Sequence, residues 1–187
     1  MDTDWNVVWD RKGATESSDH FEVSGFEHFR DFDTAAAADV LIDLLQIKPE
    51  DKVLEIGAGA GLIGRHLQTK CNYVASDRSA SMVAKSIELN RYSAVCFDAD
   101  DIVFKDKSFD KVFAFGVFHY FPDYAYARRA IDEMIRVARV AVCVIDLPTA
   151  SHEPDHLLFD ESFFADWIIG DSLYKREHKR FSALKVL

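Results

Sequence analysis

The sequence predicts one α/β domain built on an open, doubly wound, mostly parallel sheet with helices on both faces. Apolar runs alternate with helical patterns along the chain, which is typical of consecutive β-α-β units. A glycine cluster directly follows one apolar run and precedes a helix, as in a ligand-binding crevice. At 187 residues, 49% of them hydrophobic, the chain is long enough for one core and too short for two ordinary domains.

The elements follow in order from residue 33. Asp33 and Thr34 precede a run of strong helix formers from 35 to 45, which predicts a capped helix there. Ser79 is the expected N-cap of a later helix. The expected strands are 52–56, 73–76, 95–97, 111–117 and 140–147, and the expected helices are 61–67, 79–89 and 124–138.

The two flanks are less regular. Residues 160–169 look helical, and 181–187 alternate like a final strand, which we place antiparallel to the rest. Residues 1–32 form an irregular leader rich in aromatic side chains, ahead of the single domain at 33–187. This leader is either a lid over an active site or a segment packed permanently against the sheet or a dimer partner.

Composition excludes several classes of function. The 22 basic and 32 acidic residues give a net charge of -10, which repels nucleic acid. No apolar run approaches the roughly 20 residues that cross a bilayer, and the acidic first residues do not resemble an export signal. Three cysteines without CxxC spacing indicate reduced thiols in the cytoplasm. No metal site is expected, because Pro154 separates His152 from His156 and breaks a zinc-binding helix.

The glycine cluster lets the backbone turn sharply and approach a ligand closely. Residues 59–64 read GAGLIG, which fits the dinucleotide pattern GxGxxG, and Asp77 follows at about the expected spacing of 20 residues. An NAD-dependent oxidoreductase is therefore one alternative. Taken alone, this match is weak.

Residues 55–61, Glu-Ile-Gly-Ala-Gly-Ala-Gly, resemble the first motif of the class I S-adenosylmethionine-dependent methyltransferases, an acid followed by three alternating glycines. The dinucleotide pattern does not require that acid. Asp77 and the segment 98–100, Asp-Ala-Asp, also match the family's order and spacing. The resemblance covers about residues 35–147 and implies a Rossmann-like fold that binds S-adenosyl-L-methionine.

The resemblance also implies roles for single residues. Asp77 would accept hydrogen bonds from both ribose hydroxyls, Asp98 would take the adenine amino group, and the Ala99 amide a ring nitrogen. The backbone of Phe115 and Gly116 would pass the methionine end of the cofactor. The implied cofactor shell is Glu55, Gly57, Ala58, Gly59, Gly61, Asp77, Arg78, Asp98, Ala99, Asp100, Phe115 and Gly116.

Methyl transfer from a sulfonium needs mainly an acceptor held in line with the bond that breaks. A hydroxyl or ammonium acceptor also needs a base, and a histidine titrates in the useful range. His119 follows the expected strand 111–117 at its carboxyl end, where the family's acceptor lies. It is the candidate catalytic residue, and the competing interpretation is a histidine that only shapes the site.

The sequence thus predicts methyl transfer to an oxygen or nitrogen of a small molecule. Residues 115–118, Phe-Gly-Val-Phe, stand where amino methyltransferases acting on nucleic acid carry an Asn/Asp-Pro-Pro-aromatic motif. The chain is short, so either the acceptor pocket is shallow or a second copy completes it as a homodimer. Besides the oxidoreductase, a catalytically silent cofactor-binding subunit of a partner enzyme remains an alternative.

Overall fold

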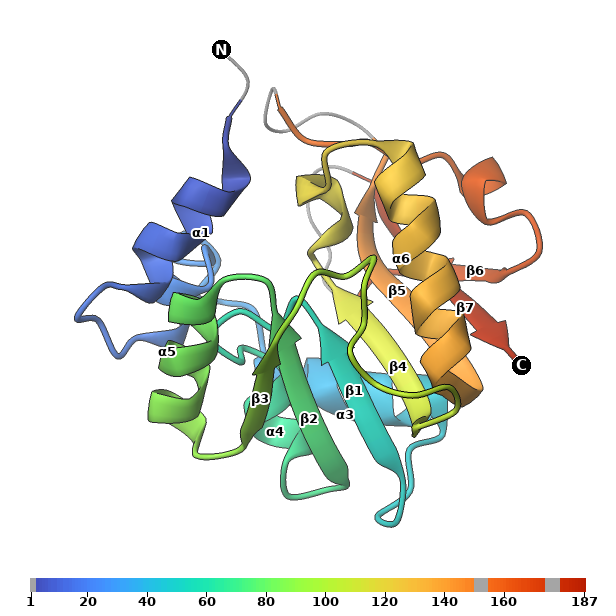
Figure 1. The fold of residues 1–187 in the computed structure, drawn as a ribbon, viewed down its shortest axis with the longest axis horizontal. Helices are drawn as coiled ribbons and strands as arrows, with labels where there is room; N and C mark the ends of the chain where they lie inside the picture. The colour runs from blue at the N-terminus through green and yellow to red at the C-terminus, as the bar shows by residue number, and fades with distance from the viewer. Residues whose placement is uncertain (1–2, 150–154, 174–178) are drawn as a thin grey trace.

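The structure is a computed structural model that describes residues 3–149, 155–173 and 179–187. Within these residues one sheet of seven strands runs in the order β3-β2-β1-β4-β5-β7-β6. The strands are β1 (Lys52–Ile56), β2 (Asn72–Asp77), β3 (Ser93–Cys96), β4 (Phe109–Phe115), β5 (Ala138–Pro148), β6 (Ile168–Asp171) and β7 (Arg180–Val186). β1 to β5 are mutually parallel, and β7 is antiparallel to both its neighbours (Figure 1). The doubly wound fold and its antiparallel last strand are confirmed.

Helices cover both faces of this sheet. They are α1 (Trp5–Gly13), α2 (His20–Val23), α3 (Thr34–Leu45), α4 (Gly64–Leu67), α5 (Ala80–Asn90) and α6 (Tyr124–Val137), with 3-10 turns η1 (Phe118–Tyr120) and η2 (Glu161–Phe164). The apolar face of α6 packs on one side of β1, β4 and β5, and α3 and α4 pack on the other. The predicted caps are confirmed: Asp33 accepts hydrogen bonds from the first amides of α3, and Ser79 from Met82 of α5.

The parallel pairing aligns the carboxyl ends of the central strands. Glu55 of β1 is opposite both Ala75 of β2 and Phe113 of β4, and Phe113 is in turn opposite Cys143 of β5. Ligands in open α/β sheets bind beyond these strand ends, where the order reverses. Here the reversal lies between β1 and β4, next to the glycine cluster.

The structure corrects several predicted elements. The helical prediction for residues 160–169 was wrong and missed β6, because these residues form only the short turn η2 before β-branched Ile168 and Ile169 pair with β7. The helix expected from residue 61 begins at Gly64, since Gly61 has a left-handed backbone, φ +84°, that a right-handed helix does not allow. The leader is not irregular either: it holds α1 and α2.

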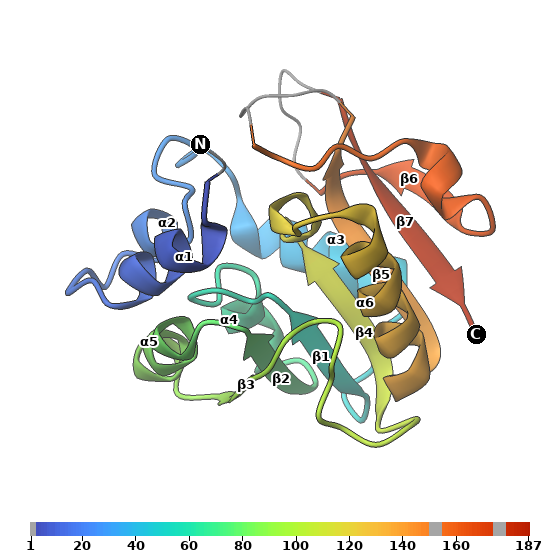
Figure 2. The ribbon, with the colours of Figure 1, turned by 45° about the horizontal axis from the view of Figure 1, so that its top comes forward.

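α1 lies beside α5 and above the carboxyl ends of the strands (Figures 1 and 2). The two helices touch closely at Gly13, where an added Cβ would lie 2.5 Å from the Met82 amide nitrogen. The Ser81 hydroxyl also donates to the Asp10 carbonyl at 2.8 Å. The leader is therefore packed against the domain, over the strand ends where a ligand is expected.

Candidate functional site

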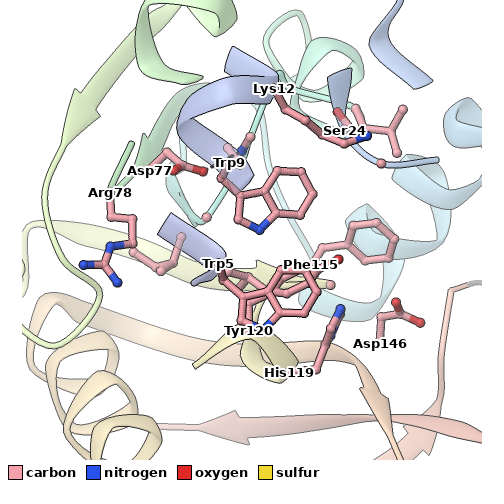
Figure 3. Close-up of a pocket in the computed structure, with 18 of the residues that line it drawn as sticks. Trp5, Trp9, Lys12, Ser24, Asp77, Arg78, Phe115, His119, Tyr120 and Asp146 are labelled. Carbon is pink, nitrogen blue, oxygen red and sulfur yellow. Dashed lines mark hydrogen bonds between the residues drawn. The ribbon is translucent and has the colours of Figure 1, made fainter. Parts of the chain in front are cut away.

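A cavity of about 450 Å³ lies at the carboxyl ends of β1, β2, β4 and β5, and α1 covers it. Its size is in the range of small-molecule and cofactor sites. Figure 3 shows Asp77 and Arg78 on one side of this cavity and His119 and Asp146 on the other. Of the predicted site residues, those that line it are Glu55, Gly57, Ala58, Gly59, Asp77, Arg78, Ala99, Phe115, Gly116 and His119.

The glycine loop after β1 owes its shape to left-handed backbone at Gly57, Gly59 and Gly61. Two of these glycines face protein: an added Cβ at Gly57 would meet Val117 at 2.5 Å, and one at Gly61 would meet the Tyr92 hydroxyl at 2.0 Å. Gly59 differs, because nothing lies within 4 Å of its Cβ position. The loop is thus packed from behind and bare toward the cavity, which fits the close approach of a ligand.

Asp77, at the end of β2, joins this loop to α5. Its Oδ2 accepts a hydrogen bond from the Gly59 amide at 3.0 Å, and its Oδ1 accepts one from the Ser79 amide at 2.9 Å. Burial raises the pKa of the Asp77 carboxyl, and the two amide bonds oppose that rise. Each oxygen can accept a further hydrogen bond, so these two amide contacts and ribose binding are compatible.

Glu55 is only 2% exposed and lies behind the loop. The Tyr73 hydroxyl donates a hydrogen bond to its carboxylate, and Tyr73 also packs under Gly64, where α4 begins. Burial is the main reason why the pKa of Glu55 rises to about 7. The acid of the first motif therefore supports the base of the loop.

Of the three residues in the segment 98–100, only one lines the cavity. Ala99 lines the cavity, whereas Asp98 is exposed and pairs with Arg78 at 3.3 Å at the cavity edge. Asp100 points to the other side and forms an ion pair with Arg129 of α6 at 2.8 Å. Asp100 and Gly61 do not line the cavity, because each is engaged by neighbouring protein groups.

The end of β4 turns under the middle of the cavity. Gly116 is left-handed, φ +64°, and its amide donates to the Ile145 carbonyl of β5 at 3.0 Å. His119 follows on η1 and is 4% exposed. Its ring centroid lies 4.1 Å from that of Tyr120 and 4.6 Å from that of His156. The predicted base thus lies in an aromatic cluster on the cavity wall.

α1 closes the outer side of the cavity with two tryptophans. The Trp5 ring lies 4.8 Å from that of Tyr120, and the Trp9 ring 5.0 Å from the same ring. Trp5 also donates through its indole nitrogen to the Asp155 carbonyl at 3.3 Å, and the Thr3 amide donates to the Asp155 carboxylate at 3.0 Å. The start of α1 is thereby joined to the segment that follows β5.

Sequence reasoning missed several residues that line the cavity, Asp146 among them. It is the single charged residue within 140–147, the expected apolar strand. An acid in a fully buried strand was the signal that could have identified it. Among the described residues, no three His, Cys, Asp or Glu side chains lie close enough together to hold a metal ion. His152 lies outside the described residues.

Comparison with known proteins also indicates a methyltransferase. The profile of a methyltransferase domain matches residues 54–143. The Bacillus subtilis (strain 168) protein YrhH, whose name describes it as a methyltransferase, is 26% identical over 134 residues, which are 66% of this chain and 74% of YrhH.

Two solved structures share the fold. Haemonchus contortus phosphoethanolamine N-methyltransferase 1, in complex with phosphoethanolamine and S-adenosylhomocysteine, superposes with a TM-score of 0.77 at 16% identity, over 96% of this chain and 47% of that one. The chain thus spans about half of that protein's length. Magnesium protoporphyrin IX methyltransferase from Synechocystis PCC 6803 with bound SAM gives a TM-score of 0.64 at 17% identity, over 99% and 92%. The sequence matches and the shared fold together support a class I S-adenosylmethionine-dependent methyltransferase.

Proposed function

We propose that this methyltransferase transfers the methyl group of S-adenosylmethionine to an oxygen or nitrogen of a small molecule held between α1 and the ends of β4 and β5. The cavity divides accordingly. The half formed by the glycine loop, Asp77, Arg78 and Ala99 would bind the cofactor, and the half near His119 and Tyr120 would bind the acceptor.

One observation carries the cofactor assignment: Gly59 faces open cavity while its amide donates to the carboxylate of Asp77, which also accepts from the amide of Ser79, the N-cap of α5. A ligand can approach this backbone closely, with Asp77 fixed beside it as a hydrogen-bond acceptor for ribose hydroxyls. When bound, the cofactor supplies an electrophilic methyl group. The protein's own task is then to position the acceptor and exclude water.

His119 is the residue that we propose as the base. It lies on the cavity wall directly after the strand end along which the methionine part of the cofactor would run. A histidine there can take a proton from an acceptor hydroxyl or ammonium at neutral pH. We expect His119→Gln to keep cofactor affinity and to lower turnover by about 100-fold or more.

We further propose that residues 1–32 serve as a lid over the site. Supporting this, α1 lines the cavity and is joined to Asp155 on the far side. Ligand entry would require these contacts to open.

Among the described residues no helix is long and apolar enough to span a bilayer. We place the reaction in the cytoplasm on the three unpaired thiols, and a homodimer stays a prediction.

The test is methyl transfer itself. Purified protein would be incubated with S-adenosylmethionine labelled in the methyl group and with pools of small amines, alcohols and phenols, and His119→Gln would be run in parallel. Label in an organic acceptor that depends on His119 supports the proposal. Cofactor binding without transfer to any acceptor would favour the catalytically silent subunit instead.

The lysine and the arginine that line the cavity are already paired: Lys12 with Glu27 at 3.2 Å and Arg78 with Asp98 at 3.3 Å. A nucleic acid substrate would need unpaired cations for its phosphates. The charges at the site therefore support a small-molecule acceptor.

A further inference from the structure

Asp146 is a buried acid at the acceptor side of the cavity. It belongs to β5, and its side chain is 1% exposed. Its backbone is left-handed, φ +68°, which is uncommon for a residue other than glycine and gives cause to look for a function. The Cβ position of Gly116 lies 3.5 Å from Asp146 Oδ2. The carboxylate therefore lies against the strand end that passes under the middle of the cavity.

The counter-ion of Asp146 lies outside the cavity wall. Arg180 of β7 donates from Nη1 to Asp146 Oδ2 at 2.8 Å and to the Asp146 carbonyl at 3.0 Å. The Ser172 hydroxyl donates to Oδ1 at 3.2 Å. Arg180 and Ser172 do not line the cavity, whereas Asp146 does. The ion pair thus holds the carboxylate in one orientation, and the acid rather than the guanidinium borders the ligand space.

Aromatic rings surround the same region. Trp5, Trp9 and Tyr120 line the cavity together, with ring centroids 4.8 and 5.0 Å apart at the two tryptophan–tyrosine contacts. Figure 3 shows Trp5 and Tyr120 beside His119, next to Asp146. Aromatic faces attract cations, most strongly where water is excluded. A carboxylate among such rings favours a positively charged group over a neutral or anionic one.

The other charges at the cavity and on the protein also favour a cationic acceptor. Lys12, a cation that lines the cavity, is engaged by Glu27 at 3.2 Å and by the Glu22 carbonyl at 3.0 Å. Its ammonium group is therefore already engaged and does not favour an anionic acceptor. The net charge of -10 also attracts cations to the protein surface in general.

We propose that the methyl acceptor is a primary or secondary amine and that Asp146 binds its nitrogen. This inference rests on the proposed function and narrows its acceptor class. The ammonium form would bind between Asp146 and the aromatic rings and lose one proton to His119. The nitrogen lone pair then forms a bond to the methyl carbon as the carbon–sulfur bond breaks, and that electron pair stays on sulfur. The products are a methylated ammonium ion and a neutral thioether, so charge and atoms balance.

The experiment compares matched amines and alcohols, such as phenethylamine with 2-phenylethanol and ethanolamine with ethylene glycol. Methyl transfer to each is measured for the wild type and for Asp146→Asn. Because Asp146→Asn leaves Arg180 buried without its partner, the double variant Asp146→Asn/Arg180→Met is measured too. Asp171→Asn, on exposed β6, is the control. S-adenosylhomocysteine affinity is determined for every variant.

The wild type should methylate amines at least about 10-fold faster than the matched alcohols, as expected for a charge-assisted contact. Both Asp146 variants should lose that preference and keep S-adenosylhomocysteine affinity, and Asp171→Asn should behave like the wild type. Equal rates on alcohols and amines, or an amine preference that survives in the double variant, would overturn this inference alone. Failure of the wild type to bind S-adenosylhomocysteine would overturn the proposed function as well.

Discussion

The two halves of the cavity are assembled in different ways. The half proposed to bind the cofactor comes from consecutive strand ends between Glu55 and Gly116, within the region that matches the methyltransferase profile. The half proposed to bind the acceptor joins Trp5, His119 and Asp146, which are far apart in the chain. The first half depends on backbone shape, because a glycine loop and strand-end groups form it. The second depends on side chains, so its chemistry can change without changing the fold.

The largest effect should come from the packed side of the glycine loop. In Gly61→Ala the added methyl group would clash with the Tyr92 hydroxyl and the Asn90 amide, in a left-handed backbone. We expect a loss of roughly 3 kcal/mol in the free energy of unfolding, from strain plus overpacking. Denaturant unfolding would measure it.

Gly59→Ala is the matched control, since it shares the left-handed backbone but faces open cavity. It should cost only about 1 kcal/mol of stability and weaken S-adenosylhomocysteine binding by about 10-fold or more, because the methyl group enters the ligand space. Equal loss of stability in both variants would contradict the division of the loop into a packed and an open side.

Glu55 should make stability depend on pH. Its pKa in the folded protein is about 7, above the ordinary value of 4.5, so the folded state holds a proton that the unfolded state has released between these values. The contribution of Glu55 to stability is therefore fully present below pH 4.5 and falls as pH rises to 7, by about 3 kcal/mol. Glu55→Gln should lack this decline. The free energy of unfolding of both proteins would be measured by chemical denaturation between pH 4.5 and 7. The same change with pH in the variant and in the wild type would refute the role of Glu55.

Asp77→Asn tests the strand-end acceptor of the cofactor half. An amide in place of the carboxylate weakens the charge-assisted hydrogen bonds to ribose, and S-adenosylhomocysteine affinity should fall by about 1.5 to 3 kcal/mol. Titration calorimetry on a variant with wild-type circular dichroism would show this. Unchanged affinity would remove Asp77 from the binding site and leave it only its hydrogen bonds from the Gly59 and Ser79 amides.

Gly13→Ala tests whether the position of α1 over the acceptor half matters for turnover. The new methyl group would meet backbone atoms of Ser81 and Met82 at 2.5 to 2.6 Å, so α1 must move away from α5. We expect about 1 to 2 kcal/mol of lost stability and a larger loss in turnover than in cofactor affinity. If both fall together, α1 belongs to the cofactor half as much as to the acceptor half.

The smallest effect should distinguish the two acids of the 98–100 segment. Asp98 is exposed at the cavity edge, so Asp98→Asn should weaken S-adenosylhomocysteine binding by at most about 1 kcal/mol. Asp100→Asn should leave it unchanged, because Asp100 pairs with Arg129 of α6. Calorimetry on both variants would compare them, and a greater loss for Asp100 would reverse their assignment.

The sequence could predict the cofactor half because its features are local. Glycines at fixed spacing, an acid at the end of a strand and the caps Asp33 and Ser79 each act within a few residues. It could not show that Glu55 faces Tyr73, or that Asp100 faces Arg129, since these directions depend on packing between distant segments.

In the proposed acceptor half, the sequence predicted His119 but missed Asp146 for the same reason. Asp146 was hidden in an apolar strand, and only the pairing of β5 with β7 brings Arg180 behind it. The leader was expected to be irregular, and its two helices depend on caps from Asp4 and Asp19 as well as on packing against α5. A lone aromatic or acidic residue in sequence does not reveal which cavity it will face.

Binding of S-adenosylmethionine at the glycine loop is tested most directly by calorimetric titration of the purified wild type and Gly59→Ala with S-adenosylhomocysteine, with NAD titrated in parallel. We expect micromolar binding of S-adenosylhomocysteine to the wild type, weaker binding to Gly59→Ala and no binding of NAD. Binding of NAD alone, or S-adenosylhomocysteine binding that Gly59→Ala leaves unchanged, would contradict this expectation.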